Sequence, residues 1–329
     1  MIKFEYPDFW QKKMPISYIL YPLSYVYRLL GFIRKFCTKQ KKFSAPVICV
    51  GNVTVGGTGK TPLIIALASH YIKQKKNLVI ICKGYGGSFI KPTIIEANFS
   101  TCLAGDEAIE IAKEFSKSSN VTIIITKNPK DCISILSQIK PDLILIDDGL
   151  QNPSFFKDFS ILVIDGLRGL GNGFLIPSGP MRENYKPALK YADIVVSSNP
   201  SKNVKEELNR LACNKFYHIK QYLEVNVDKN EPIFLLCAIG NPEKFFVSMK
   251  NYNIVGKISF PDHHKYSTQD LDIILKKASK AGATKIVTTN KDYVKLYNLK
   301  SSIEIKTARI FFDEKDIKKI IKKIDEKIS

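Results

Sequence analysis

The sequence has no closely paired cysteines. Its seven cysteines stand singly, none belongs to a C-x-x-C motif, and several lie within apolar runs. Structural zinc sites need cysteines at defined spacings, and disulfides persist mainly in oxidising compartments. The pattern therefore indicates buried, reduced thiols and favours a cytoplasmic chain. The seven are Cys37, Cys49, Cys82, Cys102, Cys132, Cys213 and Cys237.

Acidic residues are scarce relative to basic ones. The chain has 31 Asp and Glu against 50 Lys and Arg, a formal net charge of +19. Such an excess favours an anionic partner: a nucleic acid, a phospholipid surface or a phosphorylated substrate. Disorder is excluded, because 45% of the 329 residues are hydrophobic and no low-complexity segment or short repeat occurs. A chain of this length can form two α/β domains with a substantial core.

The apolar N-terminal stretch, residues 16–33, is not followed by a small-residue cleavage site, so we expect no signal peptide. Pro22 and the cation of Arg28 interrupt it, which argues against a membrane-spanning helix. Its aromatic residues and basic flanks favour an interfacial helix on anionic lipid; a helix packed on the chain's own core is the alternative. We expect residues 1–42 to form a membrane-associating segment. The flanks contain Trp10, Lys12, Lys13, Arg34, Lys35, Lys39, Lys41 and Lys42.

A glycine-rich loop, VGNVTVGGTGKTPL at 50–63, follows a short apolar run. In a P-loop, glycine-rich backbone surrounds phosphates, a lysine reaches the terminal phosphates and the next Ser or Thr faces Mg²⁺. Lys60 and Thr61 fit these roles, although Thr54 stands where the usual spacing has glycine. A plain strand-to-helix turn is the alternative. We expect ATP phosphates to contact Thr54, Val55, Gly56, Gly57, Thr58, Gly59, Lys60 and Thr61.

Short runs rich in Val and Ile alternate with helical patterns along the chain. Continuous apolar strands are typical of a parallel sheet that is buried on both faces. We therefore predict a P-loop NTPase-like α/β domain over 43–214, with a mostly parallel sheet and helices on both faces. An extended hairpin over 215–232, with its turn near 228–230, leads to a smaller C-terminal α/β domain over 233–329. The predicted strands are 77–82, 120–126, 142–148, 159–165, 193–198, 233–240, 257–260 and 285–290.

Three acidic positions and a histidine pair are candidates for chemistry. Asp147 and Asp148 end a predicted buried strand, where an acidic residue can hold Mg²⁺. Asp106, in the motif GDE, is either a helix N-cap or a general base facing the γ-phosphate. His263 and His264 share the loop FPDHHKYS, where a histidine could orient a carboxylate or carry a proton; a surface position is the alternative.

Taken together and in order, the motifs resemble the tetraacyldisaccharide 4′-kinase family, the lipid A 4′-kinases of Gram-negative bacteria. The resemblance covers nearly the whole chain. Each motif alone is weak, but the ordered set is highly specific. The motifs are GNVTVGGTGKTP (51–62), KGYGG (83–87), GDEA (105–108), DDGLQ (147–151), GNGFLIPSGPMRE (171–183), AIGNPEKFF (238–246), FPDHHKY (260–266) and TTNKDYVKL (288–296).

The resemblance implies transfer of the γ-phosphoryl group of ATP to the 4′-hydroxyl of a tetraacylated glucosamine disaccharide 1-phosphate, which gives lipid IVA. It implies that Asp106 and His263 are catalytic, and that Thr61, Asp147 and Asp148 hold Mg²⁺. It places the enzyme at the cytoplasmic face of the bacterial inner membrane, peripheral or anchored by its N-terminus. Candidate substrate contacts are Lys83, Tyr85, Gln151 and Arg182; for Arg182 a surface salt bridge is the alternative.

Two positions depart from the family pattern. Lys83 stands where the family has arginine, so a bidentate phosphate contact becomes a point charge. Asn290 replaces a glutamate of unknown role. Neither change touches Lys60, Asp106 or His263, so we expect an active enzyme.

The net charge and the apolar N-terminus then favour an acylated, phosphorylated glycolipid and the membrane surface as partners. We expect no nucleic acid partner, and a monomer. The final helical pattern, 314–328, carries a stripe of isoleucines that we interpret first as core packing and second as a membrane contact.

A different class, a membrane-associated ATPase switch of the partitioning type, also uses a GG-x-GK-T loop. Those switches carry a lysine directly before the two glycines, where this chain has Val55. A GTPase would need an N-K-x-D motif, and TTNKD at 288–292 lacks the spacer residue. The kinase is therefore the favoured interpretation.

Overall fold

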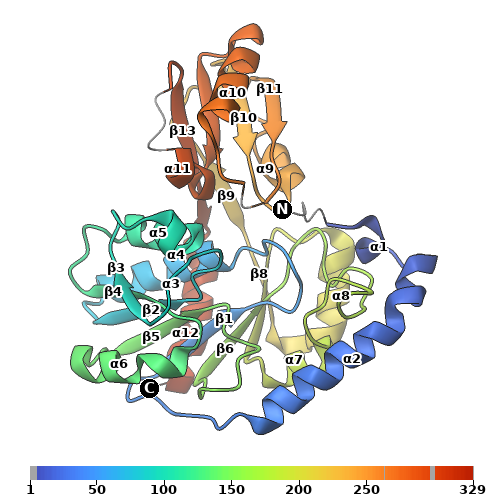
Figure 1. Ribbon diagram of the computed structural model, residues 1–329, viewed down its shortest axis with the longest axis vertical. Coiled ribbons are helices and arrows are strands. Elements are labelled where there is room, and N and C mark those ends of the chain that lie inside the picture. Colours follow the sequence, from blue (N-terminus) through green and yellow to red (C-terminus); the bar gives the residue numbers. More distant parts are fainter. Residues whose placement is uncertain (1–5, 263, 297–300, 329) are drawn as a thin grey trace.

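The computed structural model describes residues 6–262, 264–296 and 301–328. Two α/β domains lie one above the other along the longest axis, and the long N-terminal helix runs along the outside of the larger one (Figure 1). The predicted architecture of a mostly parallel sheet with helices on both faces and a second, smaller α/β domain is confirmed.

The larger domain is built on an eight-stranded sheet in the order β3-β4-β2-β5-β1-β6-β7-β8. Only β3 runs antiparallel to its neighbour, β4. The central strands are buried along their whole length, as their continuous apolar runs predict. The strands are β1 (Val47–Gly51), β2 (Leu78–Cys82), β3 (Thr93–Ile95), β4 (Val121–Ile125), β5 (Leu143–Asp147), β6 (Phe159–Val163), β7 (Ile194–Ser198) and β8 (Phe216–Ile219).

Helices cover both faces of this sheet because successive strand residues point to opposite sides. Ile48 and Val50 of β1 pack with α3, α5 and α12, whereas Val47 and Cys49 pack with α6, α7 and α8. The helices of this domain are α3 (Lys60–Lys73), α4 (Thr101–Ala104), α5 (Asp106–Glu114), α6 (Ile133–Ile139), α7 (Tyr185–Tyr191) and α8 (Lys202–Ala212).

The second sheet has five strands in the order β11-β10-β12-β13-β9, with β9 antiparallel to β13 and the other pairs parallel. Small cores on its two faces contain Phe245 and Ile274. Its elements are β9 (Gln221–Glu224), β10 (Ile233–Cys237), α9 (Pro242–Ser248), β11 (Ile254–Ser259), α10 (Thr268–Lys280), β12 (Lys285–Thr289), α11 (Asn290–Leu296) and β13 (Glu304–Phe312).

The expectation of a hairpin over 215–232 is wrong. Strand β8 extends the large sheet parallel to β7, and β9 joins the small sheet beside β13. The two strands therefore hydrogen-bond to different sheets and form the crossing between the domains. Asn199, which follows β7, contacts both strands: its backbone N–H donates to the Ile219 carbonyl of β8 at 3.0 Å, and its side chain bonds the N–H and the C=O of Gln221 in β9 at 3.0 and 2.6 Å. The expected turn at Asp228 is present, but it leads from β9 toward β10.

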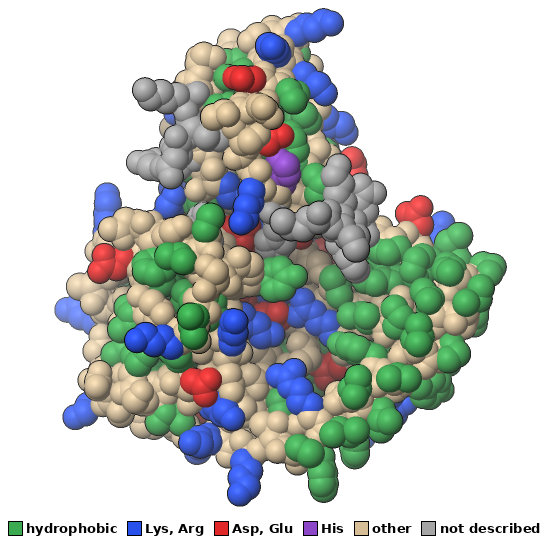
Figure 2. All heavy atoms as spheres, in the orientation of Figure 1, with side chains coloured by type: hydrophobic (Ala, Val, Ile, Leu, Met, Phe, Trp, Pro, Cys, Tyr) green, Lys and Arg blue, Asp and Glu red, His purple; other side chains and the backbone are tan. Residues whose placement is uncertain are grey.

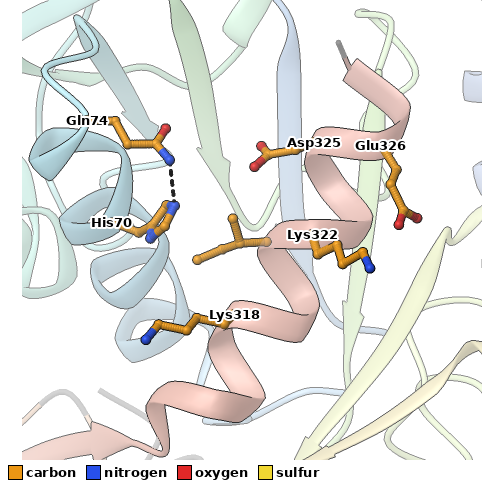
Figure 3. Close-up of a pocket in the computed structure, with 7 residues that line it drawn as sticks. His70, Gln74, Lys318, Lys322, Asp325 and Glu326 are labelled. Carbon is orange, nitrogen blue, oxygen red and sulfur yellow. Dashed lines mark hydrogen bonds between the residues drawn. The ribbon is translucent and has the colours of Figure 1, made fainter.

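The last helix, α12 (Glu314–Ile328), returns to the larger domain instead of remaining with the second one. Its isoleucines at 317, 320, 321 and 324 are buried in the same core as α3. Tyr71 of α3 donates a hydrogen bond to Asp325 of α12 at 2.8 Å. A polar hollow of about 450 Å³ lies between the two helices, lined by His70 and Gln74 on α3 and by charged residues of α12 (Figure 3).

The N-terminal helices are α1 (Asp8–Gln11) and the 23-residue α2 (Pro15–Cys37). Only Ser17 and Ser24 of α2 are buried, and Ser24 donates a hydrogen bond to the Leu175 carbonyl at 2.8 Å. The aromatic and aliphatic side chains face outward, so that hydrophobic atoms cover the helix in Figure 2. The alternative of a helix packed through its apolar side on the core is therefore wrong. By length and hydropathy α2 meets the minimum for a membrane-crossing helix, which alone is weak evidence.

Candidate active site

The glycine-rich loop joins β1 to α3 at the carboxyl edge of the large sheet. Gly56 and Gly59 have φ values of +106° and +92°, which only glycine adopts readily. In the part of the chain that the structure describes, the amides of Gly56, Gly57, Thr58 and Gly59 donate no hydrogen bond, and the buried Thr58 hydroxyl has no partner. Unpaired donors next to a helix N-terminus fit phosphate binding.

The acidic residue at the end of β5 lies beside this loop. The Thr61 hydroxyl donates to Oδ2 of Asp147 at 3.4 Å, and Oδ1 is buried without a hydrogen bond from any described residue. Burial, reinforced by Glu107, raises the pKa of Asp147 to about 7. A buried carboxylate oxygen beside a hydroxyl is the kind of ligand set that Mg²⁺ takes. The residues present therefore fit a divalent cation.

Three cationic side chains surround the carboxylate of Asp148. Its carboxylate lies 3.8 Å from Lys60 Nζ, 3.6 Å from Lys83 Nζ and 2.7 Å from an Arg182 guanidinium nitrogen. Burial alone would raise the pKa of Asp148, but the three cations outweigh it and hold the pKa well below its usual range. Arg182 thus forms a salt bridge with the partly buried Asp148 carboxylate beside Lys60 and Lys83, and its role as a substrate contact stays a prediction. The cations that could bind phosphate converge here.

The remaining substrate candidates are Gln151 and Tyr85. Gln151 donates to the Asn52 carbonyl at 2.8 Å and to Oε1 of Glu183 at 2.7 Å, and Glu183 also accepts from the Tyr191 hydroxyl. Tyr85 is 69% exposed. Sequence reasoning missed Glu183, although it directly follows Arg182 in the motif GPMRE.

Asp106 is the first residue of α5, and the N-cap is Gly105, so the alternative of an Asp106 N-cap is wrong. Its Oδ2 atom instead lies 3.2 Å from Lys295 Nζ and 4.0 Å from Lys291 Nζ. Both lysines belong to α11 of the second domain. Sequence reasoning missed them, although they stand in the quoted motif TTNKDYVKL. The second domain therefore contacts the candidate base directly.

Lys291 connects three acidic residues across the domain junction. Its Nζ atom lies 3.7 Å from Glu107 and 3.3 Å from Asp262, in addition to its contact with Asp106. Burial alone would lower the pKa of Lys291, but the neighbouring carboxylates raise it above its usual value. His263, the expected catalytic partner, lies outside the described residues. The preceding residue, Asp262, belongs to this network.

His264, the other histidine of the loop, has a structural environment. Its ring contacts Asp270 at 3.1 Å near the start of α10 and stacks on Phe260 with ring centroids 4.6 Å apart. These contacts stabilise the loop locally, away from the Asp106 carboxylate network.

The second domain also approaches the glycine-rich loop itself. A Cβ atom on Gly240 would lie 3.4 Å from the Gly57 amide nitrogen and 3.1 Å from Asp262 Oδ2. Glycine at this position allows the two backbones to come close. Nearby, Lys244 of α9 lies 3.7 Å from Asp165, which follows β6 of the larger domain. The second domain therefore contacts the glycine-rich loop near Gly57.

A glycine-rich loop with free amides, a buried acidic pair and a carboxylate held across a domain junction define a P-loop phosphotransferase. The chain belongs to the tetraacyldisaccharide-1-P 4′-kinase family, whose profile matches residues 16–328. The partitioning ATPase alternative is thereby set aside.

Relatives of the same name match most of the chain. The tetraacyldisaccharide 4′-kinase of Rickettsia bellii is 44% identical over 299 residues, 90% of this chain and 91% of that protein. That of Rickettsia africae is 38% identical over 327 residues, 98% of this chain and 100% of that protein. The "apo" form of LpxK from Aquifex aeolicus in complex with ATP aligns with a TM-score of 0.70 at 24% identity, over 95% of this chain and 99% of that chain. This structural likeness supports the fold.

Proposed function

We propose that the chain transfers the γ-phosphoryl group of ATP to the 4′-hydroxyl of tetraacyldisaccharide 1-phosphate and so forms lipid IVA. One observation supports the proposal: a P-loop with unpaired amides and a candidate base, Asp106, lie where the two domains are in contact. Glu107, the neighbour of Asp106, lies close enough to Asp147 to raise its pKa. The start of α5 is therefore near the carboxylate proposed to face Mg²⁺.

In the proposed mechanism, Lys60 and the loop amides hold the β- and γ-phosphates of ATP. Thr61 and one of Asp147 and Asp148 would hold Mg²⁺, which would supply positive charge at the phosphates. Asp106, partnered by His263, accepts the proton of the 4′-hydroxyl as its oxygen attacks phosphorus. The bond to the bridging oxygen breaks, and ADP leaves.

Binding of ATP displaces Asp148 from its cations in this scheme. Lys60, Lys83 and Arg182 are paired with Asp148 in the structure, and anionic phosphates compete for the same donors. We propose that Lys83 and Arg182, together with Tyr85 and Gln151, then bind phosphate or sugar groups of the reactants. In this scheme each of the three cations that pair with Asp148 contacts a phosphate or sugar group of the reactants.

The outward apolar side of α2 fits a membrane surface. A substrate with four acyl chains remains in the bilayer, and an enzyme on the same surface meets it at a high effective concentration. Basic residues after α2 add roughly 1 kcal/mol each on anionic lipid. We propose peripheral attachment at the cytoplasmic face of the inner membrane. One chain supplies the whole site, so we propose a monomer as the active form.

The test is transfer of label to the lipid. Purified protein is incubated with γ-labelled ATP, Mg²⁺ and tetraacyldisaccharide 1-phosphate in detergent micelles. We expect label at the 4′ position, and its loss in Asp106→Asn. Glu114→Gln, an exposed substitution at the far end of α5, is the matched control. ATP hydrolysis by folded protein with no labelled lipid would contradict the proposal.

A further inference from the structure

Arg168 lies beside the glycine-rich loop and has no part in the mechanism above. It lines a small cavity formed by loop residues 54–58 together with Tyr6, Asp165 and Gly169. Its Nη1 atom is 3.7 Å from the position that a Cβ on Gly56 would take. Gly56 is near the start of the loop and Lys60 is at its end. The guanidinium therefore lies beside the first part of the loop, four residues before the P-loop lysine in the sequence.

Two independent contacts fix the position of Arg168. The buried Asp165 carboxylate accepts hydrogen bonds from the backbone N–H groups of Leu167 and Arg168, both at 2.8 Å. The guanidinium carbon lies 4.1 Å from the centre of the Tyr6 ring, a typical cation–π geometry. The backbone is thus held by the larger domain, and the side chain by the segment that precedes α1.

Arg168 forms no ion pair with any described residue. Its side chain is half-buried, and the neighbouring loop amides are also without acceptors. Half-buried cations are usually paired, because removing them from water costs free energy. A guanidinium and several amides that face one small cavity without an acceptor together indicate an anionic ligand.

We propose that Arg168 contacts the polyphosphate of bound ATP beside Gly56, as a second cation in addition to Lys60, and stabilises the charge that develops during transfer. The inference rests on the proposed kinase function. The planar guanidinium can donate two parallel hydrogen bonds to phosphate oxygens. An arginine placed at the transferred group lowers the barrier by stabilising the charge of the transition state.

The same turn connects Arg168 to the rest of the site. Asp165 pairs with Lys244 of the second domain at 3.7 Å, and Gln11 of α1 donates to the Arg168 carbonyl at 3.2 Å. Movement of the second domain or of the N-terminal segment therefore reaches Arg168 through direct contacts. Tyr6 is accordingly a positioning residue for the guanidinium.

The first test measures nucleotide binding without lipid. Isothermal titration calorimetry with Mg²⁺ compares ATP and AMP in wild type, Arg168→Ala and Arg168→Lys. We expect Arg168→Ala to weaken ATP about tenfold, as loss of a charge-assisted contact does, and to leave AMP affinity unchanged. Arg210→Ala, an exposed substitution on α8, is the matched control. An ATP affinity within twofold of wild type would overturn the proposal.

The second test measures transfer with the same variants. We expect kcat to fall at least 100-fold in Arg168→Ala and to recover in part in Arg168→Lys. This minimum is set below the roughly 10³–10⁵-fold contribution of the arginines that activate phosphoryl transfer. Tyr6→Ala should lower kcat less than Arg168→Ala does. Tyr6→Phe keeps the aromatic ring and should have the wild-type kcat. If Arg168→Ala does not fold, Arg168→Gln replaces it. Wild-type kcat in the folded neutral variant would overturn the proposal.

The binding test separates this inference from the proposed function. If wild type labels no lipid but Arg168→Ala still weakens ATP selectively, the kinase assignment fails and the phosphate contact stands. If wild type labels lipid and the variant binds ATP normally, the kinase assignment stands and the role of Arg168 fails.

Discussion

The two edges that meet at the site contribute different charges to their contact with each other. The carboxyl edge of the large sheet presents the glycine-rich loop and carboxylates, including Asp106 and Asp165. The facing edge of the second domain presents lysines: Lys291 and Lys295 lie against Asp106, and Lys244 lies against Asp165. One edge therefore carries the residues proposed to bind phosphate, whereas the other contributes lysines that pair with acidic residues of the first.

This division separates binding from transfer. Substitutions at the first edge should damage ATP affinity and transfer together, because they remove phosphate contacts. Substitutions at the second edge should mainly lower transfer, since they disturb the position of Asp106 and leave the glycine-rich loop intact. The ratio of the loss in ATP affinity to the loss in transfer therefore distinguishes the two edges.

The largest effect is expected for Lys60→Ala at the first edge. Removal of one preorganised donor costs about 10²–10³-fold in kcat, and ATP affinity should fall as well because the terminal phosphates lose their cation. Labelled lipid and calorimetry measure the two losses. Lys73→Ala, at the exposed end of the same helix, is the control. Normal ATP affinity in Lys60→Ala would contradict the expectation that substitutions at the first edge weaken ATP binding.

At the second edge, Lys295→Met should lower kcat by about 10–100-fold while ATP affinity stays within threefold. The expected loss in kcat is part of the contribution of a general base, which is about 10²–10⁴-fold. Lys295 also lies 3.4 Å from the fully buried Asp292, so its loss removes one cation from two buried carboxylates, Asp106 and Asp292. Breaking such a pair costs about 3–5 kcal/mol of the free energy of unfolding. Denaturant unfolding measures this loss.

The double variant Lys295→Met with Asp106→Asn sharpens that experiment. Asp106→Asn neutralises one of the two carboxylates that lose a cation in Lys295→Met, so stability should partly return while transfer stays lost. Recovery of transfer along with stability would mean that Lys295 acts only on folding.

The first edge could be predicted from the sequence because its signals are local. The glycine-rich loop, the strand ending in Asp147 and the apolar run of β1 each occupy a few consecutive residues whose spacing reflects their geometry. The same holds for the mostly parallel sheet, since continuous apolar strands indicate burial on both faces.

The second edge could not be predicted because its residues gain their role only through packing. Lys291 and Lys295 look like ordinary surface lysines on a short helix until α11 is placed against α5. The prediction of a hairpin over 215–232 failed for the same reason. β8 and β9 are adjacent in sequence, and no local sequence pattern shows that they join different sheets. β13 was not among the predicted strands, because charged residues in IEIKTARIFF hide its pairing.

A smaller effect is expected for Lys244→Ala. The lysine is partly exposed, at 21% of its side chain, and pairs of this kind contribute about 0.2–1 kcal/mol. We expect kcat to fall no more than about fivefold, the equivalent of about 1 kcal/mol, and the loss to shrink at high salt. A salt series of initial rates measures it. A loss as large as that of Lys295→Met would show that Asp165 and the Arg168 turn depend strictly on the second domain.

The smallest effect on the site is expected for α2, which belongs to neither edge. Leu30 and Phe36 are 62% and 85% exposed, so Leu30→Ser with Phe36→Ser should change the free energy of unfolding by less than about 0.5 kcal/mol and leave ATP affinity unchanged. Sedimentation with anionic vesicles should nevertheless show weaker binding, because each buried CH₂ contributes about 0.8 kcal/mol to membrane attachment. Ser24→Ala, which faces the protein, is the control: it removes the hydrogen bond to Leu175 and should lower stability while vesicle binding stays the same. If the outward pair changed stability and left vesicle binding intact, the exposed side of α2 would serve a protein contact instead of a lipid surface.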